Sequence, residues 1–344
     1  MISRFCFNIA INENIKNIYK IFFSENKNYE HNLKNELSNI YKNSNFYFFD
    51  YGRTAFYEAL NQIKKKTNKR KILINSLTLF EIVNVIIYSG FKPVFIDTQK
   101  KSFQTEIDLN NFTSDLNEIA AVVITHLNGI NLNIINLKKQ IVDHNKSNEK
   151  IYLIEDCAVA LGSKINQENV GTFGDYSFLS FNIMKNITCY TGGVLIDNIN
   201  QNLNIDNLKY KKLSKIDILK KILFVIILQA LNTKILFPLF FKIIKYSHKY
   251  SITFFLKKYR TDFEVKIEDK FPSRFSFLMH FFQKKILLSQ FKDFKKKQLS
   301  RIQKAEIYYS DLKNIKYLAF PQDKFDEKNI FLEFPIICSS NIIK

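Results

Sequence analysis

The sequence is poor in the residues and patterns that mark extracellular, disulfide-linked or zinc-binding proteins. Its 344 residues include four cysteines, Cys6, Cys157, Cys189 and Cys338, without a C-x-x-C pair or a histidine cluster at metal-ligand spacing. Neither a disulfide framework nor a zinc site is therefore indicated. Residues 1–20 lack the continuous apolar core and the small-residue cleavage site of a secretory signal. These absences predict a protein of the reducing cytoplasm.

Two nucleotide-binding motifs are also missing. No G-x-G-x-x-G and no Walker A sequence occurs, which disfavours a standard dinucleotide or P-loop site. The chain has no internal repeat and no linker rich in glycine, serine or proline.

The composition is that of a basic globular protein. Lysine and arginine number 51 against 32 aspartates and glutamates, which gives a formal net charge of +19. Hydrophobic residues make up 46% and charged residues 24%, enough apolar material for a sizeable core. The length predicts one large unit and something smaller. Because the basic residues are spread along helices without a recognition-helix or aromatic-stacking pattern, we expect no nucleic-acid partner.

Apolar runs with strand character alternate with amphipathic helical stretches between about residues 45 and 200. The alternation predicts an α/β domain with a parallel sheet flanked by helices. The runs end in polar residues, among them Asp50, Asp97, Thr125 and Asp156, and ligands of open α/β sheets bind at the carboxyl ends of the strands. We therefore expect the functional site at those ends. The strand-like runs are 45–50, 71–76, 92–97, 120–125 and 151–156, and the helical stretches are 54–66, 79–90 and 133–146.

Residues 216–260 have a different character, with two apolar blocks that Lys234 and polar neighbours separate and that other lysines flank. Neither block reaches the roughly 20 apolar residues of a membrane-spanning helix. A true membrane span is the least favoured of three interpretations, and the other two are the following. The segment packs against the protein's own core or a partner subunit, or it makes peripheral contact with the inner face of the membrane.

The last part of the chain is helical and then strand-like. Residues 275–314 predict one long, basic, amphipathic helix, and strand-like stretches follow at 315–320 and 330–340. Because the chain stops directly after a strand-like stretch, we expect a small C-terminal α+β domain that is truncated. The predicted organisation is a large α/β domain over 1–205, an apolar insertion with basic flanks over 206–265, and a C-terminal part over 266–344.

Three short motifs carry polar residues suited to chemistry. DYGRTAFYEAL places Gly52, Arg53 and Thr54 between a strand and a helix, where free backbone N–H groups and a hydroxyl can bind an anion such as phosphate. IYLIEDCAVALGS has two carboxylates at the end of a buried strand, and KNITCYTGG has a lysine before a Gly-Gly turn. Each motif alone is weak evidence, since strand-end aspartates often cap helices and most lysines lie on the surface.

Together, these motifs resemble the DegT/DnrJ/EryC1/StrS family of sugar aminotransferases that depend on pyridoxal phosphate. The resemblance covers about residues 45–198, and it is carried by ED-x-A-x-A-L-G, VGTFGD, and SF-x-x-x-K before the Gly-Gly turn. It implies a type I pyridoxal-phosphate transferase fold, with a mostly parallel sheet flanked by helices and a small C-terminal α+β domain. It also implies a homodimer.

The resemblance implies roles for the matching residues. Lys185 would form a Schiff base with the cofactor aldehyde and move the proton, and Asp156 would pair with the pyridine nitrogen. Ser180 matches the serine that contacts the cofactor phosphate, and Phe80 would replace the aromatic residue that stacks on the ring. The phosphate-binding turn would be formed by Gly52, Arg53 and Thr54.

Some positions depart from the family pattern. Val159 stands where the family has a glutamine or histidine near the ring hydroxyl, and Leu79 stands where it has the stacking aromatic residue. Arg274 lacks the asparagine that accompanies it in the family. His126 is interpreted as a structural residue that bonds a loop carbonyl, and Glu155 and Asp175 as structural residues that bond loop amides.

The implied function is transfer of an amino group from glutamate or glutamine to a nucleotide-linked keto sugar, for the synthesis of a surface polysaccharide such as O-antigen or capsule. Retention of Lys185, in place of the histidine found in dehydratases of this fold, favours transamination. The alternative is a catalytically degenerate relative that binds pyridoxal phosphate or a nucleotide sugar without turnover. Val159, Leu79 and the early chain end favour that alternative, and Lys185 and Asp156 oppose it.

Overall fold

The computed structural model describes residues 7–25, 28–98, 107–109, 116–132, 134–200, 202–205, 210–249, 267–321 and 325–338. Cys6, residues 206–209 and 250–265 of the predicted insertion, and the end of the strand-like stretch 330–340 lie outside these ranges.

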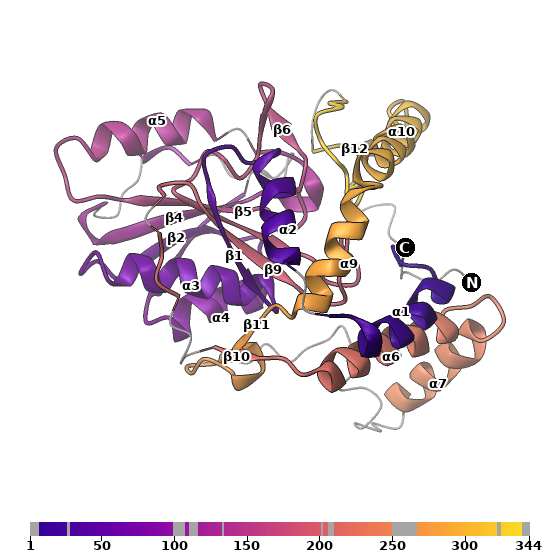
Figure 1. Cartoon of the computed structure of the whole chain (residues 1–344). Helices are drawn as coiled ribbons and strands as arrows, with labels where there is room; N and C mark the ends of the chain where they lie inside the picture. Colours follow the sequence, from indigo (N-terminus) through magenta and orange to yellow (C-terminus); the bar gives the residue numbers. More distant parts are fainter. Residues whose placement is uncertain are drawn as a thin grey trace.

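A mixed sheet runs through the centre of the molecule (Figure 1). Five neighbouring strands, from β8 to β3, run parallel, whereas β9 is antiparallel to both β1 and β8. The predicted, mostly parallel α/β sheet is confirmed, and each of the five predicted strands differs from the observed one by a single residue. Within the described ranges the order across the sheet is β10 (Lys211–Lys212), β11 (Phe277–Leu278), β1 (Asn45–Phe49), β9 (Gly193–Asp197), β8 (Tyr176–Ser180), β5 (Tyr152–Asp156), β4 (Ile119–Thr125), β2 (Lys71–Asn75) and β3 (Lys92–Ile96).

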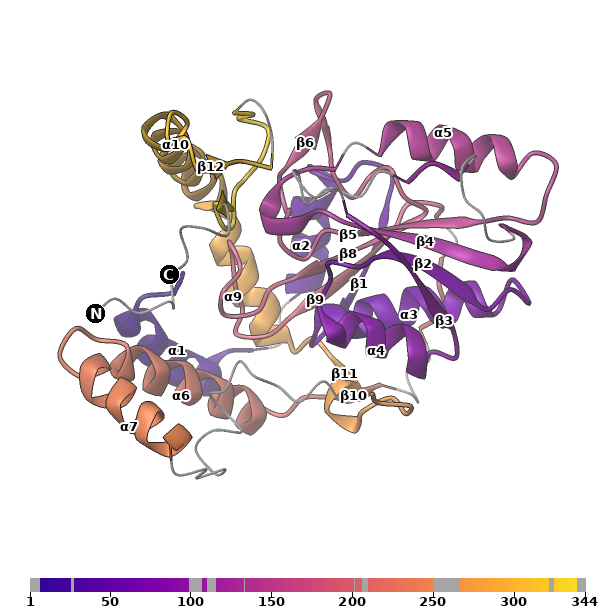
Figure 2. The same ribbon diagram turned by 180° about the vertical axis from the view of Figure 1, so that it is seen from behind.

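Helices cover both faces of the sheet, as Figures 1 and 2 show from opposite sides. On one face, α3 (Gly52–Lys64) and α4 (Phe80–Tyr88) pack against the sheet in one buried apolar cluster. On the other face, α2 (Tyr29–Ser38), α5 (Ile135–His144) and α9 (Phe281–Phe291) contribute to a second cluster. The helices predicted at 54–66, 79–90 and 133–146 are therefore confirmed.

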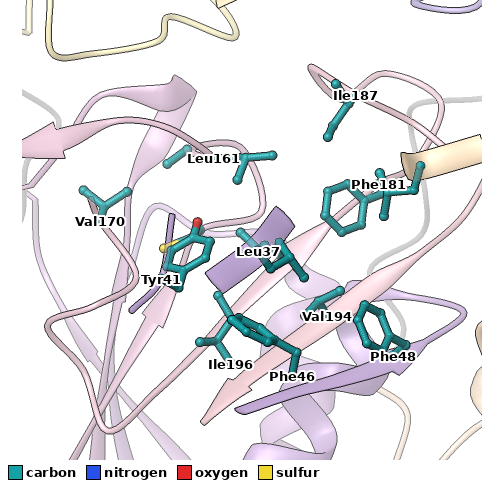
Figure 3. Packing of buried hydrophobic residues seen from close by; sticks show 14 of the residues in the cluster. Leu37, Tyr41, Phe46, Phe48, Leu161, Val170, Phe181, Ile187, Val194 and Ile196 are labelled. Carbon is teal, nitrogen blue, oxygen red and sulfur yellow. The ribbon is translucent and has the colours of Figure 1, made fainter. Parts of the chain in front are cut away.

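The period-two pattern of the strands explains the second cluster. Val194 and Ile196 alternate along β9 and face the same side, because successive side chains of a strand point to opposite faces. Figure 3 shows them together with Phe46 of β1 and with Leu37 and Tyr41 from the end of α2 and the turn after it. This apolar layer continues to the loop that holds Lys185, since Phe181 and Ile187 belong to it.

Three helices gather at one end of the molecule in both views: α1 (Ile11–Phe23), α6 (Lys215–Leu231) and α7 (Phe237–Lys249). α6 packs against α1 and buries Ile218, Ile222 and Val225 in the second cluster. This packing supports, for α6, the interpretation that the insertion folds onto the protein's own core. Among the residues that the structure describes, no helix is long and apolar enough to span a bilayer.

The single long helix predicted over 275–314 is wrong. Two helices, α9 and α10 (Phe294–Leu312), meet at Lys292 and Asp293, and Asp293 has φ −100° and ψ 4° instead of regular helical angles. α9 also begins late, because the ring Nδ1 of His280 accepts a hydrogen bond from the Phe282 amide and caps the helix.

The residues before α9 form β11, which extends the large sheet. β10 and β11 come from the two later predicted segments, yet both join the sheet of the first. The boundaries at 205/206 and 265/266 stay a prediction. The strand-like stretches near the C-terminus form only the short antiparallel pair β12 (Leu318–Ala319) and β13 (Ile337–Cys338). The remaining elements are the hairpin β6 (Lys164–Ile165) and β7 (Glu168–Asn169), and the 3₁₀ turns η2 (Leu116–Glu118), η3 (Leu127–Gly129) and η4 (Ser273–Phe275).

Candidate active site

Polar side chains converge at the carboxyl ends of the parallel strands, as the strand-end residues predicted. Thr125 ends β4 and is in register with Asp156, which ends β5, so both lie on the face that α3 and α4 cover. Ser180 ends β8, two residues beyond Phe178, which is in register with Asp156. Residues two apart share a face. Ser180 therefore points to the same side as Asp156 and Thr125.

Asp156 is buried at this edge, and its Oδ1 accepts a hydrogen bond of 3.0 Å from the Ala158 amide. Burial raises the pKa of Asp156, while the Ala158 bond and the positive charge of Lys185 act in the opposite direction. A buried carboxylate of this kind gains from a nearby cation. Asp156 is therefore suited to pair with a protonated ring nitrogen.

Lys185 lies in the loop between β8 and β9, in a turn where its amide donates to the Asn182 carbonyl at 3.0 Å. Asn8 holds the turn from outside by donating to the Lys185 carbonyl. Burial lowers the pKa of Lys185, and the negative charges of Asp156 and Glu333 partly oppose this effect. The lowered pKa increases the fraction of neutral amine, which is the nucleophilic form.

The predicted phosphate turn lies against the end of β8. α3 begins at Gly52 after Tyr51, which has extended angles and no side-chain cap, so the first backbone N–H groups of the helix have no partner within it. A Cβ at Gly52 would lie 3.1 Å from the Cβ of Ser180 and from the Leu179 carbonyl oxygen. Gly193 fits still more tightly, because its Cβ would overlap the Tyr51–Gly52 peptide. These two glycines let the turn, β8 and β9 approach one another.

The two residues after Gly52 behave differently from each other. Arg53 places its Nη1 3.5 Å from an Oε1 of Glu81 in α4, and its guanidinium lies 5.1 Å from the centre of the Phe275 ring. Its positive charge also acts on Lys185, so it lies close to the site. Thr54 is fully buried and its hydroxyl donates to the Phe275 carbonyl at 2.9 Å. In this arrangement the single hydroxyl hydrogen of Thr54 ties α3 to the 273–275 turn, and its role in phosphate binding stays a prediction.

The aromatic and basic residues of the family pattern are only partly placed. Phe80 is the first residue of α4 and is partly exposed, next to Glu81, which pairs with Arg53. Its stacking role stays a prediction. Arg274 points to Glu268, with 2.8 Å between Nη2 and Oε1.

His126 and Glu155 form the buried foundation of the site. The His126 Nδ1 accepts from the Leu132 amide at 3.0 Å, so its Nε2 donates to Glu155 at 3.1 Å. Glu155 also accepts from the amides of the 171–174 loop at 2.7 to 2.8 Å. Cys157 lies close enough to His126 and Glu155 for the three side chains to be considered as metal ligands. The carboxylate oxygens of Glu155 are, however, already saturated by four hydrogen-bond donors. The loop amides predicted as partners of Glu155 are confirmed, whereas His126 bonds the Leu132 amide and Glu155 in place of the predicted loop carbonyl.

Sequence reasoning did not single out Glu333 as part of the site. Its amide donates to the Asn128 carbonyl at 3.3 Å, and the nearby Ile330 amide donates to the Gly129 carbonyl at 3.1 Å. The C-terminal segment is thus fastened to the loop after β4, and this places the Glu333 charge where it acts on Lys185. No motif or spacing signals this contact, because more than 140 positions separate the two residues in sequence.

The fold is shared with solved sugar aminotransferases. Over 99% of this chain and 78% of the other, it superposes on PseC of Helicobacter pylori, an aminotransferase of pseudoaminic acid biosynthesis, with a TM-score of 0.67 and 16% identity. The sugar aminotransferase CalS13 of Micromonospora echinospora gives 0.68 over 99% and 82%, with 14% identity. Fold and site therefore define a protein of the sugar-aminotransferase fold with a partly buried lysine and a buried aspartate at the carboxyl edge of its sheet.

The chain belongs to the DegT/DnrJ/EryC1/StrS aminotransferase family, whose sequence profile matches residues 11–210. Among curated relatives, it is 36% identical over 129 residues to GDP-perosamine synthase of Escherichia coli O157:H7, and 33% identical over 133 residues to that of Vibrio cholerae. Each match covers 34% of the relative's length, against 37% and 38% of this chain. The similarity thus spans about a third of these relatives.

Proposed function

We propose that the chain is an aminotransferase that uses pyridoxal phosphate and transfers an amino group from glutamate or glutamine to a nucleotide-linked keto sugar. The observation that carries the proposal is the partly buried Lys185, with its lowered pKa, close enough to the buried Asp156 at the carboxyl edge of the sheet for their charges to interact. Family membership and the nucleotide-sugar enzymes among the relatives support the substrate class. The product would serve surface polysaccharide synthesis.

The residues present fit the cofactor. The hydroxyl of Thr125, in register with Asp156, is buried without a hydrogen-bond partner among the described residues. Buried polar atoms are rarely left unpaired in proteins, so a polar ligand at this edge would satisfy it. The start of α3 at Gly52 lies against the Cβ of Ser180, so the first N–H groups of the helix and the Ser180 hydroxyl would suit a phosphate.

When bound, pyridoxal phosphate supplies an aldehyde and an electron-withdrawing ring. Lys185 would offer its Nζ as the nucleophile and then carry protons between substrate and product. Asp156 would hold a proton on the ring nitrogen through its carboxylate. Gly52, Arg53 and Ser180 would bind the phosphate, and Phe80 would cover one side of the ring.

An absorption titration tests this proposal. Addition of pyridoxal phosphate to the purified chain should give a visible band that the Lys185→Ala variant lacks and that the Lys139→Ala variant, altered at an exposed lysine of α5, retains. Glutamate should bleach the band, and a nucleotide-linked keto sugar should restore it. A band that glutamate leaves unchanged would favour the alternative, a catalytically degenerate binding protein, which Val159 also favours. The absence of a band in the wild-type chain would contradict the proposal.

We propose further that the active chain is a homodimer. Its support is a set of exposed apolar side chains in loops that follow the parallel strands: Leu77 and Leu79 after β2, and Met184, next to Lys185 in sequence, after β8. Exposed apolar patches mark association surfaces. Sedimentation velocity should show a dimer for the wild-type chain, and Leu79→Asp should shift it toward the monomer. A wild-type monomer at micromolar concentration would contradict this proposal.

We also propose that this cytoplasmic protein contacts the inner face of the membrane peripherally through residues 216–260. Apolar side chains on the described part of this segment, such as Ile227, Ile235 and Leu239, are exposed, and Lys242 and Lys245 beside them are exposed as well. Such a surface suits anionic headgroups and the acyl boundary. The chain should sediment with anionic vesicles more than with neutral ones, and Ile235→Asp with Leu239→Asp should abolish the difference. Equal recovery in the supernatant with both vesicle types would contradict it.

A further inference from the structure

A buried polar cluster joins four distant segments just behind the predicted phosphate turn. Asp50, the residue after β1, is almost completely buried. Its carboxylate accepts bonds from the Thr191 hydroxyl at 2.5 Å, from the Gln283 side chain at 2.9 Å, and from Lys221 at 2.5 and 2.7 Å. Lys221 belongs to α6 and Gln283 to α9. The cluster therefore ties both of these helices to the sheet.

Lys221 supplies the charge that this cluster needs. In the part of the chain that the structure describes, it is the cation within ion-pair distance of Asp50, whereas Thr191 and Gln283 are neutral donors. A buried carboxylate that loses its cation retains a large desolvation penalty. The charge balance at the end of β1 thus depends on a residue of the apolar insertion.

The cluster fixes the two chain segments that meet beneath the phosphate turn. Asp50 precedes the Tyr51–Gly52 peptide, and Thr191 precedes Gly193, whose Cα lies directly against that peptide. Lys221 Nζ also lies 5.3 Å from the centre of the Tyr51 ring. Any shift of Asp50 or Thr191 would therefore move one side of this tight contact.

We propose that Lys221 is a positioning residue for the phosphate turn. Its ammonium group neutralises Asp50 and holds residues 51–53 against Gly193 in the conformation that receives the phosphate. The inference rests on the proposed function, because it concerns the same turn. It also makes α6 part of the catalytic framework, although that helix lies in the insertion and carries no residue of the family motifs.

The expected effect of losing Lys221 is mainly electrostatic. Without the ammonium group, an unpaired carboxylate would lie two residues from the turn that binds a phosphate dianion. The dissociation constant of pyridoxal phosphate should rise about tenfold or more, because charges near a protein site interact with an effective dielectric constant of about 20 instead of 80. Pyridoxal, which lacks the phosphate, should lose much less affinity.

The experiment compares three variants with the wild-type chain. Lys221→Met removes the charge and keeps most of the apolar stem, and Lys220→Met changes the exposed lysine next to it as a control. The double variant Asp50→Asn with Lys221→Met removes both charges and keeps an acceptor for Thr191. Dissociation constants for pyridoxal phosphate and for pyridoxal are measured by absorption, and circular dichroism follows the fold.

We expect Lys221→Met to weaken pyridoxal phosphate selectively, Lys220→Met to change little, and the double variant to recover most of the lost affinity. If Lys221→Met does not fold, the comparison of the double variant with the wild-type chain decides. In that case, the inference is supported if the double variant folds and binds pyridoxal phosphate with an affinity within about threefold of wild type. The single variant would then be unfolded because the charge of Asp50 is not balanced.

Equal losses for pyridoxal phosphate and pyridoxal, or wild-type affinity in Lys221→Met, would overturn the inference while the proposed function stands. If the wild-type chain binds neither compound, the proposed function fails first, and the inference about the phosphate turn fails with it. The wild-type titration and the comparison between variants thus separate the two failures.

Discussion

Replacement of Glu155 by glutamine should destabilise the protein severely, although the two side chains have the same shape. Each carboxylate oxygen accepts two hydrogen bonds: Oε1 from the amides of Phe173 and Gly174 at 2.7 Å, and Oε2 from the Gly171 amide at 2.8 Å and His126 at 3.1 Å. Glutamine has one oxygen and one NH₂ group. Whichever way its amide turns, the NH₂ group faces two buried donors.

The magnitude follows from the number of donors left unpaired. Each buried donor without an acceptor costs about 1 to 3 kcal/mol, so two donors cost about 2 to 6 kcal/mol. The His126 side offers no escape through the other imidazole tautomer, since Nδ1 already accepts from the Leu132 amide. A loss of this size is a large share of the roughly 5 to 15 kcal/mol that stabilises a typical protein.

Urea denaturation followed by circular dichroism measures this effect. The Glu155→Gln variant should unfold at a clearly lower urea concentration with an unchanged m-value, whereas Glu168→Gln, at an exposed position of the β6–β7 hairpin, should match the wild-type chain. A loss of less than about 1 kcal/mol in Glu155→Gln would refute the reasoning, because it would mean that the four donors find other partners.

Three further predictions concern the site itself. Thr54→Val should cost about 1 kcal/mol of stability through the lost bond to the Phe275 carbonyl. It should leave the dissociation constant of pyridoxal phosphate within about twofold of the wild-type value. A rise above tenfold would contradict this, because it would correspond to a direct contact of about 1.4 kcal/mol. Gly193→Ala should destabilise the chain in urea by about 1 to 3 kcal/mol and abolish cofactor binding in the absorption titration. The reason for both is that the added Cβ overlaps the backbone of the phosphate turn. Normal cofactor binding in this variant would contradict the close approach. Acetylation of Lys185, followed by mass spectrometry, should reach half its maximal rate below pH 10.4, the usual pKa of lysine, because burial lowers the pKa of Lys185. Asp156→Asn should lower that pH further, because it removes a negative charge that raises the pKa of Lys185. An upward shift in Asp156→Asn would refute the assigned interaction.

The sheet could be predicted because its strands are local signals. Residues 120–124 and 151–154 are continuously apolar, since both faces of a central parallel strand are buried. The break between α9 and α10 could not be predicted in the same way, because residues 281–312 keep helical spacing through Lys292 and Asp293. Short strands such as β10 and β11 depend on pairing with each other. Two residues are too few to show the alternating pattern that would predict a strand.

The strand-end rule predicted that polar side chains gather at one edge of the sheet but could not assign the individual residues. Of its four polar residues, Thr125 and Asp156 lie side by side on the face of the site. Asp97 accepts from the adjacent Thr98 amide on the surface. Asp50 turns away to Lys221, a residue 171 positions later in the chain. The position of a strand-end carboxylate depends on the cation that long-range packing brings to it. Because the chain has 51 basic residues, no local signal in the sequence indicates which of them is that cation. Comparison of the Lys221→Met and Lys220→Met variants therefore tests whether one lysine among many is required because it neutralises the charge of Asp50.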